Sequence, residues 1–270
     1  MKKLFLAVCF AVLFSPRVKA DFEIVLNYTG DAQYLPLFEN AAATWESLLI
    51  GYQDGLVVTR FAGSSYNIGD TVDRVFIDAA IDMIDGPDGA LAEARPTSAI
   101  VDSSNFILAT NGEMTFDEDD VPGLAASSFE DIILHEMGHV LGFDTLWDLN
   151  GVYAGPGVGE YTGARATLAW QNEFGQMGTP DVELGGGLGT ADGHWNEIDE
   201  GAGLTGITDN QGRDLAFELM TGWFNGNAFI SNMTVQSFVD IGFTAIPEPG
   251  SGSLFMLALL LTTSRRRIQY

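Results

Sequence analysis

The sequence predicts a mixed α/β fold, of the α+β or α/β kind, in which a twisted mixed sheet is backed by a helix and followed by an irregular C-terminal part. Three observations favour it. Strand-like runs alternate with an amphipathic helix in the N-terminal half, a second helix follows near the middle of the 270 residues, and a glycine-rich region comes after it. Residues 21–245 have the size of one sizeable domain once the two ends are set aside as processing signals.

The N-terminal half is expected to supply the strands. Apolar residues at helical spacing predict a helix over Leu35–Leu49 with one buried face. Turns rich in Gly, Ser and Asn separate the strand-like runs around it. Strands are expected over Phe22–Leu26, Leu56–Phe61, Val72–Ile77 and, as two short strands about the turn signal Asn111-Gly112, over Asn105–Phe116.

A second helix is expected over Ser127–Leu141. Ser127 and Glu130 have the spacing of a capping box, so Ser127 is the expected N-cap. Gly142 is placed to end the helix in the left-handed conformation.

The chain after this helix is expected to contain little regular structure. Residues 150–206 are rich in glycine and lack periodicity, which in a compact domain indicates a long loop region held by function or by metal. A short closing helix is expected over Ser231–Gly242, with Ser231 near its start and Gly242 as its stop.

The N-terminus has the pattern of a signal peptide. Lys2 and Lys3 precede the apolar run Leu4–Phe14, and Val18-Lys19-Ala20 offers small residues at the positions that a signal peptidase reads. The apolar run is shorter than the about 20 residues that a membrane span needs. We therefore expect residues 1–20 to be a leader, the mature chain to begin at Asp21, and the protein to be exported.

The C-terminal residues 246–270 combine a Pro-Glu-Pro linker, the apolar run Leu254–Leu261 and the cluster Arg265–Arg267. This order resembles the PEP-CTERM sorting signal of Gram-negative bacteria. The resemblance implies transient inner-membrane association, removal by a sorting protease, and a final place in the secreted fraction, on the cell surface or in the extracellular matrix. The alternative is a disordered, sticky terminus.

The body of the chain is strongly acidic. Residues 21–249 hold five arginines against 37 aspartates and glutamates, a net charge of −32. Such a surface repels nucleic acid and anionic lipid and favours divalent cations or high-salt surroundings. The single cysteine, Cys9, lies in the leader, so the mature chain can form no disulfide and its stability must come from packing and bound ions.

A metal-binding motif lies within the second helix. His135 and His139 are four residues apart and therefore project from one helical face, with Glu136 beside them. A hydrolytic zinc site usually has three protein ligands, and His194 is the one other histidine in the sequence. Two alternatives remain: a chance match to the short motif, or a glutamate as third ligand, from Glu160 or Glu173.

The run from His135 through Gly142 resembles the metzincin metallopeptidase signature. The usual third histidine would fall at Thr145, and its displacement to His194 is similar to the leishmanolysin-like metallopeptidases, in which an insertion precedes the last ligand. The resemblance covers most of residues 22–244 and continues in Gly142–Trp147, Tyr161–Ala164, His194–Trp195, Glu218–Gly222 and Thr234–Gly242. Unlike the parasite enzymes, the mature chain is expected to have neither disulfides nor an N-terminal propeptide.

The resemblance implies a metzincin-like fold and an exported zinc endopeptidase that hydrolyses peptide or protein substrates. Met220 matches the methionine of the Met-turn, an apolar floor beneath the zinc. The zinc would activate water, and Glu136 would take and relay its proton. A peptide is expected to add as a strand to Gly112–Phe116.

Two other functions and a second metal stay open. The chain is alternatively a non-enzymatic exported matrix or surface protein with a structural zinc, or a zinc hydrolase acting on something other than peptides. The acidic runs Asp117–Asp120 and Asp78–Asp88 are candidate calcium sites, although neither fits an EF-hand loop, and the simpler interpretation is a solvated surface.

Overall fold

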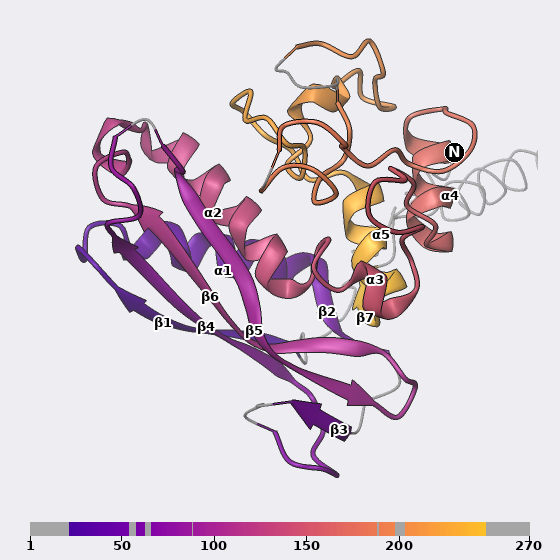
Figure 1. Ribbon diagram of the computed structural model, residues 1–270, viewed down its shortest axis with the longest axis horizontal. Coiled ribbons are helices and arrows are strands. Elements are labelled where there is room, and N and C mark those ends of the chain that lie inside the picture. Colours follow the sequence, from indigo (N-terminus) through magenta and orange to yellow (C-terminus); the bar gives the residue numbers. More distant parts are fainter. Residues whose placement is uncertain are drawn as a thin grey trace, which may run out of the picture.

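A computed structural model describes residues 22–53, 58–62, 66–87, 89–187, 189–197 and 203–246. Its largest sheet has five strands in the order β1-β4-β6-β5-β3 (Figure 1). Strands β1, β4 and β6 are parallel to one another, and β5 and β3 are antiparallel to their neighbours. The bounds are β1 Glu23–Thr29, β3 Val58–Ala62, β4 Arg74–Asp82, β5 Ala92–Asp102 and β6 Ile107–Asp117. The predicted mixed α/β class with a mixed sheet is confirmed.

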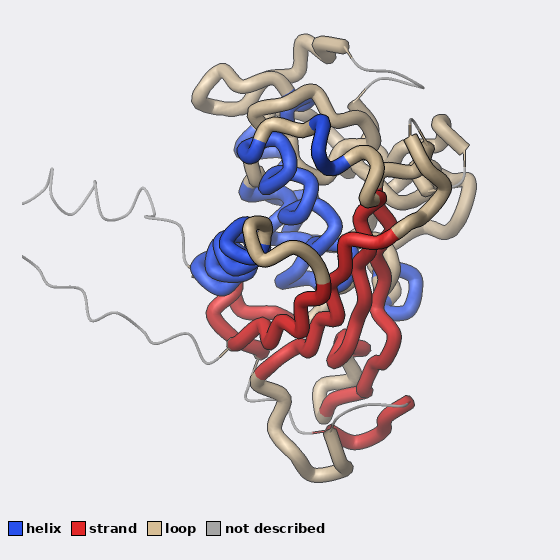
Figure 2. The backbone as a smooth tube through the Cα atoms, turned by 90° about the vertical axis from the view of Figure 1, so that its left-hand side faces the viewer, coloured by secondary structure: helices blue, strands red, loops and turns tan. Residues whose placement is uncertain are grey.

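Two long helices, α1 (Leu35–Leu48) and α2 (Ala126–Leu141), lie side by side on one face of this sheet (Figures 1 and 2). Three buried rings join the layers: Phe38 from α1, Phe116 from β6 and Phe129 from α2. Their centroids are 5.3 to 6.0 Å apart in edge-to-face pairs, a geometry that adds about 0.5–1.5 kcal/mol per pair beyond area burial. The packing fixes α2, which carries His135 and His139, on the sheet.

Gly112 does not form the turn predicted for it. Strand β6 runs straight through Asn111-Gly112, and the chain turns before it, near Asn105, which has a φ of 68°. A Cβ atom on Gly112 would lie 2.3 Å from Cγ1 of Val140 in α2. The missing side chain therefore allows the close approach of helix to sheet, which is the other role of glycine inside a strand.

The prediction that a peptide adds to the strand Gly112–Phe116 is also wrong. Gly112–Phe116 is interior, because β6 pairs with β4 on one side and with β5 on the other. The sequence analysis did not anticipate β5. Strand β3 pairs only with the second half of β5, Ala99–Asp102. Residues 92–98 of β5 therefore have no strand partner on their outer side among the described residues. The open edge next to α2 therefore belongs to β5.

Helix α2 has the predicted end but not the predicted start. Gly142 has a φ of 111°, and its N–H donates to the carbonyl groups of Gly138 and His139. At the other end the helix begins at Ala126, the N-cap is Ala125, and no side chain caps it. The capping box at Ser127 and Glu130 is therefore wrong.

The C-terminal part contains more helix than expected. It comprises α3 (Trp147–Asn150), α4 (Ala164–Glu173), the 3-10 turn η2 (Leu215–Phe217), α5 (Asn232–Asp240) and β7 (Phe243–Ala245). Strand β7 pairs antiparallel with β2 (Leu49–Tyr52), which directly follows α1. A second 3-10 turn, η1 (Val121–Gly123), precedes α2. Helix α4 falls inside the region 150–206 that was expected to be irregular.

Helices α4 and α5 cap each other. The carboxylate of Asp240, at the end of α5, accepts the N–H groups of Arg165 and Ala166 at the start of α4, both at 2.9 Å. Glu173, at the end of α4, accepts those of Asn232 and Met233 at 3.1 and 3.0 Å. Because each cap comes from a distant segment, the usual local start signals are absent from α4.

The closing helix has its predicted cap, since the hydroxyl of Ser231 accepts the N–H of Thr234. In the described part of the chain no helix is both long and apolar enough to cross a membrane. The predicted leader, residues 1–20, and the tail beyond Ile246 lie outside the described residues.

Candidate metal centre

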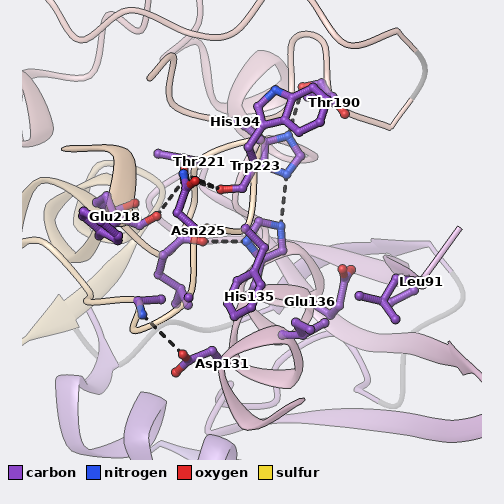
Figure 3. Close-up of a pocket in the computed structure, with 18 of the residues that line it drawn as sticks. Leu91, Asp131, His135, Glu136, Thr190, His194, Glu218, Thr221, Trp223 and Asn225 are labelled. Atoms are coloured by element: carbon purple, nitrogen blue, oxygen red, sulfur yellow. Dashed lines mark hydrogen bonds between the residues drawn. The ribbon is translucent and has the colours of Figure 1, made fainter. Parts of the chain in front are cut away.

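The three histidines of the sequence come together at one point. The Nε2 atom of His135 lies 3.0 Å from that of His139 and 3.0 Å from that of His194, and the last two are 3.2 Å apart. His139 and His194 are buried, whereas His135 borders a cleft. Figure 3 shows the rings of His135 and His194 pointing toward one another. Of the described residues, these three form the one group of histidine, cysteine or acidic side chains placed to hold a metal ion.

The other nitrogen of each ring has its own partner. Nδ1 of His135 donates to the carbonyl oxygen of Leu219 at 2.6 Å, and Nδ1 of His194 donates to that of Thr190 at 2.9 Å. Nδ1 of His139 lies 3.2 Å from a carboxylate oxygen of Asp144. A carbonyl acceptor requires the proton on Nδ1, which leaves the Nε2 lone pair free. Such partners fix the tautomer and orientation of metal-binding histidines.

The electrostatics of the rings differ. Burial, with the neighbouring charge of His139, lowers the pKa of His135 to about 3, and burial followed by both other histidines holds the pKa of His194 well below its usual value. Burial also lowers the pKa of His139, but the charge and hydrogen bond of Asp144 outweigh it and raise the value to about 9. His135 and His194 are therefore neutral at physiological pH and free to act as ligands.

This donor set fits a transition metal ion. Imidazole nitrogen suits zinc, copper, iron and nickel, whereas calcium and magnesium prefer oxygen. Three nitrogens bound to zinc at about 2.0–2.1 Å with tetrahedral angles are about 3.3 Å from one another. The observed separations of 3.0 to 3.2 Å are close to this value.

Glu136 lies beside the three nitrogens without belonging to them. It lines the clefts on both sides of the histidines, and Figure 3 shows its side chain next to Leu91. Among the described residues its carboxylate has no hydrogen-bond or ion-pair partner. Burial chiefly raises the pKa of Glu136 to about 7, aided by the charges of Asp144 and Glu93 and opposed by that of His139. The carboxylate is thus available to a molecule in the cleft.

Met220 lies under α2 and is fully buried. Its sulfur and terminal methyl are 2.9 and 3.0 Å from the position that a Cβ atom on Gly138 would occupy. Glu218 organises this turn, because its carboxylate accepts the N–H of Met220 at 2.6 Å and the hydroxyl groups of Ser231 and Thr234 at 2.8 and 2.6 Å. The turn therefore places Met220 against Gly138 and the carbonyl group of Leu219 against His135.

The alternative glutamate ligands lie elsewhere. Glu173 caps α5, and Glu160 is exposed in a bridge with Asp181. Thr145, at the position of the usual third histidine, is exposed and donates its hydroxyl to the carbonyl group of His139. The structure brings His194 to the site instead.

Three residues around the histidines were missed by sequence reasoning: Asp144, Thr190 and Leu219. Thr190 and Leu219 act through main-chain carbonyls, which leave no sequence signal. Asp144 could have been found from the sequence, because a carboxylate shortly after the motif is a natural partner for a ligating histidine. Its φ of 59° turns the chain back toward His139.

Two clefts meet at the histidines. The larger, of about 540 Å³, lies on the side of Met220 and is bordered by Leu219, Trp223 and Phe224. The smaller, of about 370 Å³, is bordered by residues 92–95 of β5 and by Asp144. Both share His135, Glu136 and His194 in their walls. The two clefts, together called the groove below, therefore adjoin at the histidines and border the open edge of β5.

Comparison of the chain with protein-family models gave no match, and comparison with curated proteins gave none either.

Proposed function

We propose that this protein is an exported zinc endopeptidase of the metzincin type, similar to leishmanolysin-like enzymes, with zinc held by His135, His139 and His194. The observation that carries the proposal is the convergence of three Nε2 atoms on a groove that also contains the unpaired carboxylate of Glu136. Glu136 is the general base and Met220 the Met-turn residue. The leader and sorting tail are part of the same proposal.

The number of protein ligands favours an enzyme over a structural zinc protein. Structural zinc sites are closed by four protein ligands, whereas catalytic sites keep one position open. The group of described residues contains three ligands, and the groove runs past them. No described residue supplies a fourth histidine, cysteine or carboxylate to this group.

Zinc bound at this site would polarise a carbonyl group and lower the pKa of a water molecule toward about 7. Glu136 is placed to accept that proton and to deliver it to the leaving amine. Its carboxylate stands free of other partners, and its partly buried surroundings bring its pKa close to neutral, as general acid–base catalysis requires. Asp144 keeps His139 in the tautomer that leaves Nε2 as a ligand.

The open edge of β5 supports a peptide as the substrate. The carbonyl group of Leu91 accepts the N–H of Asp117 from β6, so the alternation of a strand directs the backbone groups of Ala92 and Ala94 away from β6. These groups border the groove. An extended peptide that pairs with them as an additional strand would pass the histidines and Glu136.

The test is the Glu136→Gln variant, which keeps the size of the side chain but cannot relay a proton. Zinc content should be unchanged, and casein cleavage should fall by at least about 10² to 10⁴, the usual contribution of positioned acid–base catalysis. Glu118→Gln, a change at an exposed carboxylate outside the groove, is the control and should cleave as the wild type does. Equal cleavage by Glu136→Gln with zinc retained would refute the mechanism.

Substrate profiling separates peptidases from other zinc hydrolases. Under the proposal, an unstructured protein or a peptide library should be cleaved at internal bonds, since clefts lie on both sides of the histidine cluster. Cleavage of simple esters without any cleavage of peptides would favour a different zinc hydrolase.

A further inference from the structure

Two buried carboxylates lie next to the histidine-bearing segment and are not used by the proposed mechanism. Glu183 is fully buried and Glu197 is 6 % exposed. One oxygen of Glu183 accepts the N–H of Gly185, and one oxygen of Glu197 accepts that of Gly222 at 3.3 Å. Among the described residues, the other oxygens, Oε2 of Glu183 and Oε1 of Glu197, have no hydrogen-bond partner. Buried polar atoms are rarely left in this state.

The two side chains lie against the same glycine. Glu197 is bonded to the N–H of Gly222, and Cγ of Glu183 is 3.8 Å from the position that a Cβ atom on Gly222 would occupy. Their backbones belong to adjacent extended segments, because Val182 forms a bridge with Trp195. Burial first, and then the charge of Glu183, raise the pKa of Glu197 to about 7 against the effect of N–H donors. The two carboxylates are therefore neighbours that repel each other.

No positive side chain of the described residues compensates this pair. The ion pairs of arginine in the described chain join Arg74, Arg95 and Arg213 to other carboxylates. All three lysines of the sequence precede Asp21. Burying two carboxylates with unpaired oxygens is costly unless a cation or a proton is shared between them.

We propose that Glu183 and Glu197 bind a divalent cation of the calcium type, at a second metal site distinct from the three histidines. The free donor atoms are carboxylate oxygens, which calcium prefers and which do not suit a zinc site built from nitrogen or sulfur. Calcium accepts six to eight oxygen ligands, including carbonyl groups and water. The acidic surface of the chain raises the local concentration of such ions.

This cation links three segments that build the histidine site. The N–H of Glu183 donates to the carbonyl group of His194 at 2.9 Å. Glu197 follows His194 by three residues, and Gly222 follows Met220 by two. A cation between the two carboxylates therefore holds the segment that carries His194 against the turn that carries Met220. Its role is to stabilise this region, not to take part in the reaction.

The experiment compares thermal unfolding with and without calcium, in protein freed of metal by chelation and then saturated with zinc. The wild-type melting temperature should rise with calcium concentration, as it does for any ligand that binds only the folded state. Glu183→Gln and Glu197→Gln keep an oxygen that accepts the N–H of Gly185 or Gly222. Each variant should lose the calcium-dependent rise while melting no lower than the wild type without calcium, because the repulsion is gone.

The control is Glu118→Gln, in the acidic run 117–120, which should retain the full calcium response. A variant of Glu183 or Glu197 that is equally destabilised with and without calcium would show a purely structural role and overturn the proposal. So would a calcium response that Glu118→Gln abolishes and Glu197→Gln leaves intact.

Terbium provides a second measurement that does not depend on the variants. Trp195 is two residues from Glu197, and Trp223 follows Gly222, so a terbium ion at the site should luminesce when tryptophan is excited. The signal should saturate, and calcium should displace it. A wild-type protein without saturable, calcium-displaceable terbium luminescence would overturn the proposal even if both variants failed to fold.

Discussion

The sulfur of Met220 lies 2.9 Å from the position that a Cβ atom on Gly138 would occupy, so the methionine packs directly on the backbone of α2. Gly138 immediately precedes His139 and lies three residues after His135. The glycine in the middle of the motif is thus explained by contact with a turn about eighty residues further along the chain. The helix and the turn that position the histidines fit together at this point.

Gly138→Ala should destabilise the protein and weaken metal binding. At an exposed helical site this change would stabilise a helix by about 1 kcal/mol. Here the methyl group would meet Met220, and overpacking a core costs about 1–3 kcal/mol. Gly123→Ala, where a Cβ has no neighbour within 4 Å, is the matched control. Thermal unfolding and metal content measure both effects. Unchanged stability in Gly138→Ala would mean that Met220 moves aside freely.

His194→Ala should lower zinc occupancy as severely as His135→Ala, because the two Nε2 atoms are equivalent members of one group. Metal content after dialysis measures this. Glu160→Gln and Glu173→Gln test the rival ligands and should keep zinc. Full occupancy in His194→Ala would show that another side chain completes the site.

Asp144→Asn should reduce zinc affinity by about 10- to 100-fold, the usual effect of losing the carboxylate behind a ligating histidine. Asparagine keeps the shape and an acceptor oxygen, so the fold should be unaffected. Competition with a chromogenic chelator measures the affinity, and Asp148→Asn, at an exposed position on α3, is the comparison. A variant that binds zinc as tightly as the wild type would show that Asp144 does not support metal binding.

Asp117 should make the protein sensitive to acid. The N–H of Asp119, followed by those of Gly86, Ile84 and Asp85, lower the pKa of this carboxyl group to about 2 from an ordinary value of 3.8, although burial opposes them. Because the folded-state pKa is depressed, the stabilisation is complete above about pH 4 and is lost as the pH falls toward 2.

The measurement for Asp117 is unfolding by urea as a function of pH. Asp117→Asn should be less stable than the wild type at neutral pH, and the difference should shrink between pH 4 and pH 2. Glu118→Gln provides a neighbouring carboxylate change for comparison. A difference that stays constant with pH would assign the effect to packing. Asp117, which belongs to the acidic run 117–120, thus accepts backbone N–H groups and needs no calcium to explain its position.

Local signals in the sequence were sufficient for part of the site. The helix with His135 and His139 was predicted from Gly142 at its end and from a capping box at its start, of which only Gly142 is confirmed. His194 follows because a third ligand was needed and one other histidine exists. The end of α2 and the cap of α5 were predicted for the same reason: each depends on residues close in sequence.

Features that depend on distant contacts were not predictable in this way. Gly112 was interpreted as part of a turn from its neighbour Asn111 alone. Its actual role, making room for Val140 on α2, depends on a contact that the local sequence does not show. Helix α4 was missed because Asp240 caps it from α5. The pairing of β5 with β6, and hence the position of the open edge, depends on strand order, which the residues of one strand do not specify. No short motif contains both Glu183 and Glu197.

The open edge of β5 also has a consequence for solubility. An unpaired strand edge is a template on which a second copy of the chain can add, and such edges promote aggregation. Pro96 lacks an N–H group, and the exposed side chains of Glu93 and Arg95 place charge along the same stretch. Both devices discourage the continuous pairing of identical strands, while the short run at Ala92 and Ala94 stays open. Under the proposed function a short peptide would pair with this stretch, whereas the edge resists the growth of a fibril.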